Sequence, residues 1–393
     1  MTLHYEFPII NHLNDVLPHI RNDPAFIVAK RDFGTVINYV QAGKDTFPEI
    51  TDIGSAIRRE CRGLIFGKDD KIMSRRFHKF FNLGERSDVM TIDINQPHDV
   101  LEKLDGSMIT PIRMSNGNNG IRWASKMGLT DVAAQAERFI NDPNTLARYD
   151  ELAEDCLYAG QTPIFEWVSR QQRIVIDYPK DNLILTAIRD NRTGKYTSYE
   201  HLAYYQDYYY VPVVKHINSV IDDIDSFVEE LRKRQDIEGV VIRFEDGHMV
   251  KIKADTYVAL HRAKSLLDNE RDVVGLILDE KTDDLMPLLS EDDKQALSVF
   301  SDQVWRDIFA FQTRVNVVLR GCEQLNISRK DFAIHSDGVD QMVRSFVFSC
   351  WEPKTCSVER IVDSIKNHLS SNARYEKAKQ ILRTAKWRQV GNE

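Results

Sequence analysis

The sequence lacks the features that mark several classes of protein. It contains no run of about 18 consecutive apolar residues, so we expect no transmembrane helix. The N-terminal segment, MTLHYEFPII, has no basic stretch ahead of an apolar core, so we expect no signal peptide. The five cysteines are odd in number and form no CxxC pair. A disulfide scaffold and a zinc ribbon are therefore excluded, and buried free thiols in a reducing cytoplasm are expected.

Basic residues are not in excess either. The formal net charge is −8, whereas proteins that coat nucleic acid are usually basic. Charge is nevertheless uneven along the chain, with seven acidic residues against one lysine in residues 279–293 and six basic residues against one glutamate in residues 371–390. The basic segment is interpreted as a helix whose cations either face solvent or contact a nucleic-acid backbone.

Glycine and proline are scarce after residue 260, where only four of the 18 glycines and two of the 12 prolines lie. Before that point, short β-branched or aromatic-rich segments predict strands at residues 62–67, 163–168, 173–178, 183–189, 238–244 and 248–253. Asp246-Gly247 predicts a tight hairpin between the last two, and helices are expected near 130–142 and 221–234. Beyond that point, helical periodicity covers residues 293–320, 338–350 and 356–386. We therefore predict an α+β domain over residues 1–260 and an all-helical domain over residues 261–393.

Basic residues stand in three motifs of the first domain. Lys103 lies in LEKLDGS beside a predicted turn, and a lysine that loses its proton is a nucleophile. Arg62 lies in ECRG at the start of a predicted strand, where its permanent charge suits a phosphate or a ribose. Lys79, in RRFHKFFNLGE, is flanked by phenylalanines that could stack on a base while the cation binds phosphate. Each motif alone also fits an ordinary turn, strand entrance or amphipathic core segment.

Two carboxylates occupy unusual places in predicted strands. Glu166 lies in the middle of the apolar segment PIFEWV, where a carboxylate needs a hydroxyl, a cation or a metal ion as its partner. Glu238 opens EGVVIRF, and Lys251 and Lys253 share one face of the next strand, HMVKIK. Two cations opposite a carboxylate suit a polyphosphate and its metal ion. A structural salt bridge or an exposed, charged strand face is the alternative at each place.

The order of these motifs is more specific than any one of them. A lysine, a strand carboxylate about 60 residues later, E-G before apolar residues and then K-x-K resemble the covalent nucleotidyltransferases, which comprise DNA ligases, RNA ligases and mRNA capping enzymes. The stretches ECRG, KFFNLGE, KLDGS, FEWV, RIVIDY and EGVV are similar to the RNA ligase 1 family of T-even-type bacteriophages, and the resemblance covers most of residues 55–290. The segment TYVALHRAKSLLDN discriminates best, because DNA ligases and capping enzymes do not carry it after K-x-K.

The resemblance implies an adenylyltransferase domain with antiparallel sheets, followed by the helical domain. Catalytic roles fall on Lys103, which becomes adenylylated, on Lys126 in the ligation steps and on Tyr257, which is needed for activity. The implied ATP or AMP contacts are Arg62, Lys79, Glu166, Lys251 and Lys253. The implied metal ligands are Glu238 and Asp283, with Asp284 beside the latter.

The function implied is the joining of 5′-phosphate and 3′-hydroxyl RNA ends, with ATP and Mg²⁺, through a lysyl-AMP enzyme and an adenylylated RNA. In a phage, the expected substrate is transfer RNA nicked in its anticodon loop. We expect a monomer that works in the cytoplasm of the host cell, without a membrane partner, and a helical domain that favours the structured RNA.

Two positions depart from the family pattern, and other functions stay open. Leu104 stands where the family has an acidic residue, and Ile37 aligns with an aromatic ATP contact, with Tyr39 two residues later. A DNA ligase or a GTP-using capping enzyme is the nearest alternative, but these usually append a β-rich OB barrel where this chain predicts helices. A non-catalytic RNA-binding relative would be expected to have lost Lys103 or the K-x-K pair, and both are present.

Overall fold

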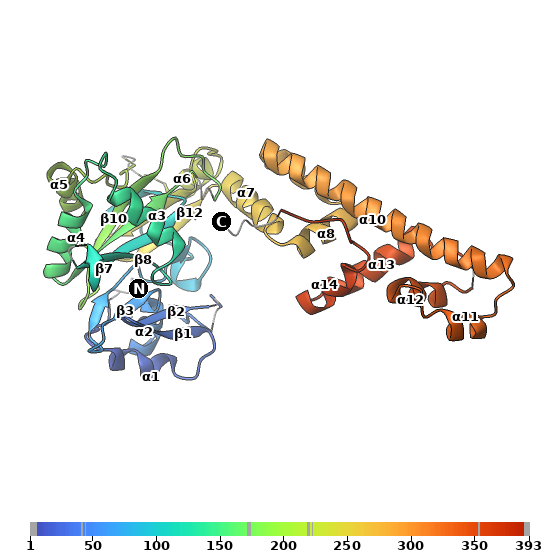
Figure 1. Ribbon diagram of the computed structural model, residues 1–393. Helices are drawn as coiled ribbons and strands as arrows, with labels where there is room; N and C mark the ends of the chain where they lie inside the picture. The colour runs from blue at the N-terminus through green and yellow to red at the C-terminus, as the bar shows by residue number, and fades with distance from the viewer. Residues whose placement is uncertain are drawn as a thin grey trace. The chain divides into compact units, whose positions relative to one another are not determined.

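The computed structural model describes residues 6–40, 42–43, 45–118, 120–170, 174–217, 221, 223–352 and 354–388 (Figure 1). The chain divides into two units, Met1–Val258 and Ala259–Glu393, and the division lies near the boundary expected from the glycine and proline distribution. The first unit mixes strands and helices, and the described residues of the second are helical or irregular. The predicted α+β fold class with an all-α C-terminal part is therefore confirmed.

Three four-stranded sheets build the first unit, in the strand orders β1-β2-β3-β4, β10-β9-β7-β8 and β5-β12-β11-β6. Neighbouring strands are antiparallel, apart from the parallel pair β12 and β5. The strands are β1 (Phe26–Arg31), β2 (Gly34–Tyr39), β3 (Leu64–Phe66), β4 (Ile72–Ser74), β5 (Phe81–Asn82), β6 (His98–Lys103), β7 (Ser107–Asn118), β8 (Ile121–Ser125), β9 (Gln161–Val168), β10 (Asn182–Asp190), β11 (Gly239–Phe244) and β12 (Met249–Lys253).

Five of the six predicted strand segments contain strands, namely β3, β9, β10, β11 and β12. The prediction for residues 173–178 is wrong: residues 174–178 are bends and irregular chain, and residue 173 lies outside the described residues. The reason is a contact with a residue far away in the sequence. The backbone N–H groups of Val175 and Ile176 donate to the carboxylate of Asp105 instead of pairing with a neighbouring strand.

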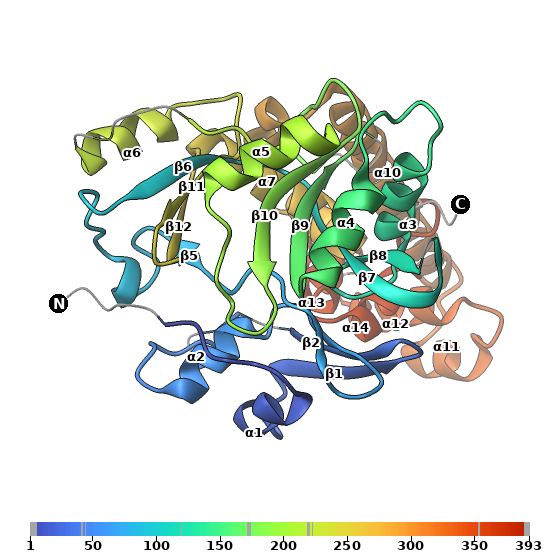
Figure 2. The same cartoon turned by 90° about the vertical axis from the view of Figure 1, so that its left-hand side faces the viewer.

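Helices cover the outer faces of two sheets. Helices α3 (Asp131–Ile140), α4 (Tyr149–Tyr158) and α5 (Tyr199–Tyr209) pack against β10-β9-β7-β8 and form one apolar core with it (Figure 2). Helix α6 (Ile224–Arg232) packs against β12. Helices α1 (Leu17–Ile20) and α2 (Ile53–Glu60) share an apolar core with strands of the N-terminal sheet. Short 3₁₀ helices occur at Leu13–Asp15 and Ser87–Val89. The side chains of Thr130 and Asp223 accept backbone N–H bonds at the starts of α3 and α6, which fixes where those helices begin.

Helix α10 (Glu291–Gln324) is the longest element of the second unit, and its buried stripe enters a core of helical residues. The other helices are α7 (Asp255–Leu267), which begins in the first unit, α8 (Glu270–Leu278), α9 (Thr282–Leu285), α11 (Arg329–His335), α12 (Gln341–Ser349), α13 (Val358–His368) and α14 (Asn372–Ala378), with a 3₁₀ turn at Met286–Leu288. No described helix of either unit is long and apolar enough to cross a membrane.

The basic segment is not one helix, so that interpretation of residues 371–390 is corrected. Within residues 371–388, only α14 is helical, and the chain after it is held instead by Asp307, which accepts hydrogen bonds from the backbone N–H groups of Thr384 and Ala385. The helix expected over residues 356–386 is likewise interrupted before Ser371, whose side chain caps α14.

Candidate active site

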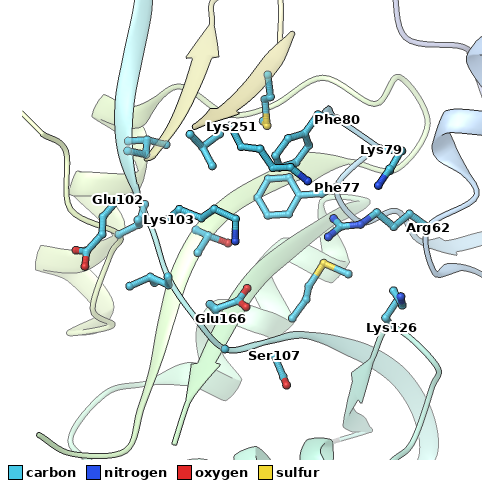
Figure 3. A pocket seen from close by; sticks show the side chains of 18 of the residues that line it. Arg62, Phe77, Lys79, Phe80, Glu102, Lys103, Ser107, Lys126, Glu166 and Lys251 are labelled. Carbon is cyan, nitrogen blue, oxygen red and sulfur yellow. The ribbon is translucent and has the colours of Figure 1, made fainter. Parts of the chain in front are cut away.

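A cavity of about 580 Å³ lies between two sheets of the first unit. Strands β6, β11 and β12 form one wall. Strands β11 and β12 contribute alternate residues, and the intervening residues of β11 face the apolar core on the other side. The opposite wall includes Glu166 of β9, Ser107 of β7 and Thr186 of β10. Figure 3 shows Lys103, Lys251 and Arg62 extending toward the middle of this space, with Glu166 below Lys103.

Strand register brings together residues that are far apart in the sequence. Gly239, the first residue of β11, is paired with Lys103 on one side and with Lys253 on the other. Glu238 immediately precedes it, and its Oε1 lies 2.6 Å from Lys103 Nζ and 2.9 Å from Lys253 Nζ. The Glu238 side chain is only 3% exposed, whereas Lys103 is 22% exposed and remains accessible from the cavity. One buried carboxylate therefore holds two lysines at the end of the sheet.

The turn after Lys103 is fixed by a second buried carboxylate. Asp105 Oδ2 accepts hydrogen bonds from the N–H groups of Val175 and Ile176, and its Oδ1 accepts one of 2.7 Å from the Tyr257 hydroxyl. The next residue, Gly106, passes so close to β9 that a Cβ atom would lie 2.3 Å from the carbonyl oxygen of Trp167. Glycine is required here because a side chain would push Lys103 away from its position.

Two groups in the cavity have pKa values displaced toward neutrality. Burial lowers the pKa of Lys251 to about 7, and the positive charges of Lys79 and Lys103 act in the same direction. Burial raises the pKa of Glu166 to about 7, against the opposing effect of Lys103. Both side chains can therefore exchange a proton near neutral pH, which is the behaviour expected of groups in a reactive site.

Three further cations surround the aromatic ring of Tyr39 at the end of β2. The Nζ atoms of Lys126 and Lys79 lie 4.8 Å and 5.5 Å from the ring centroid, and the positive charge of Arg62 also acts on the hydroxyl. Burial opposes ionisation of Tyr39, but the charges of these three cations outweigh it and lower its pKa. Among the described residues, no carboxylate forms an ion pair with Arg62, Lys79, Lys126 or Lys251. Such a set of unpaired cations favours a polyanionic ligand.

Seven of the residues singled out in the sequence line this cavity, namely Arg62, Lys79, Lys103, Lys126, Glu166, Lys251 and Lys253. Glu238 contacts two of them, and the Tyr257 ring lies 4.9 Å from Lys253 Nζ. Asp283 is exposed in α9 of the second unit, so its role as a metal ligand stays a prediction. In the described ranges, no group of three or more His, Cys, Asp or Glu side chains could hold a metal ion by itself.

The structure adds two residues that the motifs did not reveal as parts of the cavity, Tyr39 and Leu104. Tyr39 lines it, whereas Ile37, which aligns with the family's aromatic contact, is fully buried in the core. Leu104 also contributes to the lining and packs with Leu101. The signal for Tyr39 was present in the sequence, since residues two apart on a strand share a face.

Comparison with known proteins gives a consistent result. The sequence model of the RNA ligase family matches residues 60–257, half of the chain. A protein of Thermovibrio ammonificans, provisionally named an RNA ligase, is 29% identical over 307 residues, covering 74% of this chain and 76% of its own. RNA ligase 1 of bacteriophage TS2126 is 28% identical, with 71% and 69% covered. A polynucleotide kinase/RNA ligase provisionally named in Autographa californica nuclear polyhedrosis virus is 25% identical, with 67% and 39% covered.

Solved structures give weaker matches. An archaeal ATP-dependent RNA ligase, form 2, superposes with a TM-score of 0.44 at 13% identity, covering 72% of this chain and 74% of its own. Its form 1 gives a TM-score of 0.43 at 14% identity, covering 91% and 83%. Similarity at this level does not by itself support a conclusion about function.

Proposed function

Because the chain belongs to the RNA ligase family, we propose that the cavity of the first unit uses ATP to adenylylate Lys103 and then seals RNA ends. The observation that carries this proposal is the arrangement of Lys103 beside Glu238 and Lys253, facing four cations that lack a carboxylate partner among the described residues. A nucleophile, a polyanion subsite and a glycine turn thus share one cavity.

In the first proposed step, the Lys103 amine attacks the α-phosphorus of ATP. The N–P bond forms, the bond to the β-phosphate oxygen breaks, and pyrophosphate leaves with the electron pair. Phosphoryl transfer depends mainly on positioning and charge neutralisation. Lys251 and Lys253 are placed to offset charge on the α-phosphate, and Arg62, Lys79 and Lys126 to hold the leaving group. Lys251 and Glu166 can exchange the displaced proton near neutral pH.

In the second and third proposed steps, AMP passes from Lys103 to the 5′-phosphate of an RNA end, and a 3′-hydroxyl then attacks the activated phosphate and releases AMP. The family resemblance assigns Lys126 to these steps. The same resemblance supports nicked transfer RNA as the substrate and a role of the second unit in substrate specificity. It also supports membership of the RNA ligase 1 family of T-even-type bacteriophages and a monomer that works in the cytoplasm. We include all of these in the proposal.

A magnesium ion fits this donor set only together with substrate. Glu166 lines the cavity, Glu238 lies next to it against Lys103 and Lys253, and both offer hard carboxylate oxygens. Mg²⁺ is commonly held by one or two carboxylates plus phosphate oxygens and water. Glu238 would then hold the ion, and Asp283 is a second proposed ligand from the resemblance alone. When bound, the ion would neutralise charge on the phosphates.

The test is a labelling experiment with the full chain. Wild type and Lys103→Ala are incubated with magnesium and ATP labelled on the α-phosphate, and the protein is resolved on a denaturing gel. We expect a labelled wild-type band that Lys103→Ala reduces to background, because the covalent step is lost. Lys103→Ala should still seal pre-adenylylated RNA, which bypasses that step.

Each alternative function has its own result in this experiment. Lys379→Ala, which removes a lysine of the second unit, should label like the wild type. Label from GTP alone would indicate a capping-type guanylyltransferase, and sealing of nicked DNA in preference to RNA would indicate a DNA ligase. Absence of label from either nucleotide would contradict the proposal and favour a non-catalytic RNA-binding relative.

A further inference from the structure

Arg76 is a fully buried arginine behind the cavity, and it does not line the cavity itself. Its side chain is bonded to neutral groups of three segments. Nε donates to Thr110 Oγ1 at 2.9 Å, and Nη1 donates to the carbonyl of Gly63 at 2.7 Å. Weaker bonds of 3.4 Å and 3.5 Å run to the carbonyls of Lys126 and Ala124. One guanidinium therefore joins the backbone next to Arg62 to the backbone that carries Lys126.

The neighbouring buried arginines differ from Arg76 in having a carboxylate partner. Arg75 and Arg189 are equally buried, and both form ion pairs with the buried carboxylate of Glu60, at 3.0 Å and 2.8 Å. Burial alone would raise the pKa of Glu60, but these two cations lower it to about 2, so their charge is compensated within the protein. No described carboxylate pairs with Arg76, and burial together with the charge of Arg62 lowers its pKa to about 9.

A buried cation without a carboxylate is costly in the free protein. The cost is acceptable at this place if an anion is bound nearby for part of the catalytic cycle. Arg62, the residue beside Gly63, and Lys126 face the cavity at the end where no acidic residue of the described ranges pairs with the cations around Tyr39. Bound phosphate groups would therefore compensate both the exposed cations and the buried one behind them.

We propose that Arg76 is the positioning residue of the phosphate subsite, holding Arg62 and Lys126 at their separation and having its charge balanced by the bound polyphosphate. This inference rests on the proposed function, because it assumes that the cavity takes a polyphosphate. The role needs the planar fork of arginine. A lysine keeps the charge but cannot reach Thr110 and Gly63 in the same geometry.

The experiment measures binding and catalysis separately for Arg76→Lys in the full chain. Inorganic pyrophosphate is titrated into the protein in a calorimeter, and lysyl-AMP formation is followed at increasing ATP. We expect pyrophosphate affinity about tenfold weaker and a KM for ATP about tenfold higher, with a smaller change in kcat, because the lost contacts hold ground state and transition state alike. Sealing of pre-adenylylated RNA should also slow, since Lys126 is displaced with Arg62.

Arg75→Lys is the matched control, because it alters an equally buried arginine whose partners are Glu60 and backbone carbonyls away from Gly63 and Lys126. It should lower the melting temperature and leave pyrophosphate affinity within twofold of wild type. If Arg76→Lys does not fold, Thr110→Val decides instead, because it removes the hydroxyl that accepts from Nε and leaves the charge in place.

The outcomes separate this inference from the proposed function. Unchanged pyrophosphate affinity and KM in Arg76→Lys, or in Thr110→Val where Arg76→Lys does not fold, would overturn the positioning role. An equal loss in Arg75→Lys would also overturn it, since a general packing defect would then explain the result. Wild-type protein that binds pyrophosphate through Arg76 but forms no lysyl-AMP would contradict the proposed function and leave the positioning role supported.

Discussion

The two units differ in how their basic residues are paired with carboxylates. Residues 371–390 of the second unit carry six basic residues against one glutamate, yet there Lys379 pairs with Glu376 at 3.2 Å, Arg388 with Asp293 at 2.6 Å, and Arg383 with Asp340. In the first unit, the cavity cations come from six separate segments. Lys103 and Lys253 pair with Glu238, and Arg243 pairs with Asp99, whereas no described carboxylate pairs with the other four. The number of basic residues in a segment is therefore a poor guide to anion binding. Whether the fold places a carboxylate beside each basic residue is a better guide.

The physical basis of the difference is whether a nearby carboxylate compensates the positive charge of each basic residue. A surface cation beside a carboxylate has its field offset locally, and such pairs contribute only about 0–1 kcal/mol. A half-buried cation without a partner is destabilised in its charged form, which is why the pKa of Lys251 falls to about 7. A phosphate that binds beside such a cation relieves that cost. The binding site is therefore the place where cations of the free protein lack a compensating negative charge.

The largest predicted effect contrasts one glycine in each unit. Gly106→Ala would place a Cβ atom 2.3 Å from the Trp167 carbonyl oxygen, so the turn that presents Lys103 must shift. We expect lysyl-AMP formation to fall about 100-fold and the free energy of unfolding to fall by about 1–3 kcal/mol. Gly321→Ala lies inside α10 with nothing within 4 Å of the added carbon, and it should stabilise the protein by up to about 1 kcal/mol with activity unchanged.

Labelling assays and denaturant titration of both variants check this contrast. Wild-type labelling by Gly106→Ala would mean that the close approach to β9 does not position Lys103. A loss of labelling in Gly321→Ala would show that this glycine of the second unit also affects the reaction of Lys103.

A second, intermediate effect is proton uptake on anion binding. Lys251 has a pKa of about 7 in the free protein, so it is largely neutral at pH 8, and bound pyrophosphate favours its charged form. Glu166, raised to about 7, is ionised at pH 8 and also favours protonation when an anion binds. We therefore expect uptake of protons at pH 8 that diminishes toward pH 6, and affinity that falls by up to about tenfold per pH unit above the pKa.

Calorimetry of pyrophosphate binding in buffers with different ionisation enthalpies measures the uptake. Lys251→Arg should remove the larger part of it, and Glu166→Gln the rest, whereas Lys379→Arg in the second unit should leave it unchanged. Uptake that persists fully in Lys251→Arg would show that Lys251 is already charged in the free protein.

The smallest predicted effect concerns the basic segment itself. Because Lys379 and Arg383 are already paired, replacing both with glutamine should change the KM for RNA by less than about threefold. Lys126→Gln, in the first unit, should have the greater effect on sealing of pre-adenylylated RNA. A more than tenfold rise in the RNA KM for the double variant would identify residues 371–390 as an RNA-binding surface after all.

The sequence predicted those parts of the fold that depend on local pattern. The segments EGVVIRF and HMVKIK became β11 and β12, and the placement of Lys251 and Lys253 on one face followed from strand periodicity. The resemblance added that the sheets of the first domain are antiparallel. The fold class could therefore be predicted before any coordinates were known.

Other parts depend on contacts between distant residues, and no local pattern reveals them. Residues 174–178 carry strand-forming side chains, but Asp105, about 70 positions earlier, takes their N–H groups. The Asp105–Tyr257 bond spans 152 positions, and the bonds of Arg76 reach Thr110 and Lys126 in different strands and turns. The end of α14 depends in the same way on Asp307, which lies in another helix.

The central claim is that Lys103 is the nucleophile, and the most direct test is to map the modified residue. Lys251 is the competing candidate, since its lowered pKa of about 7 makes a neutral amine available in the same cavity. Wild-type protein is incubated with ATP and magnesium, digested, and its peptides are analysed by mass spectrometry. We expect AMP on the peptide that contains Lys103 and none on the peptide that contains Lys251. AMP on Lys251, or on any lysine outside the cavity, would contradict the claim.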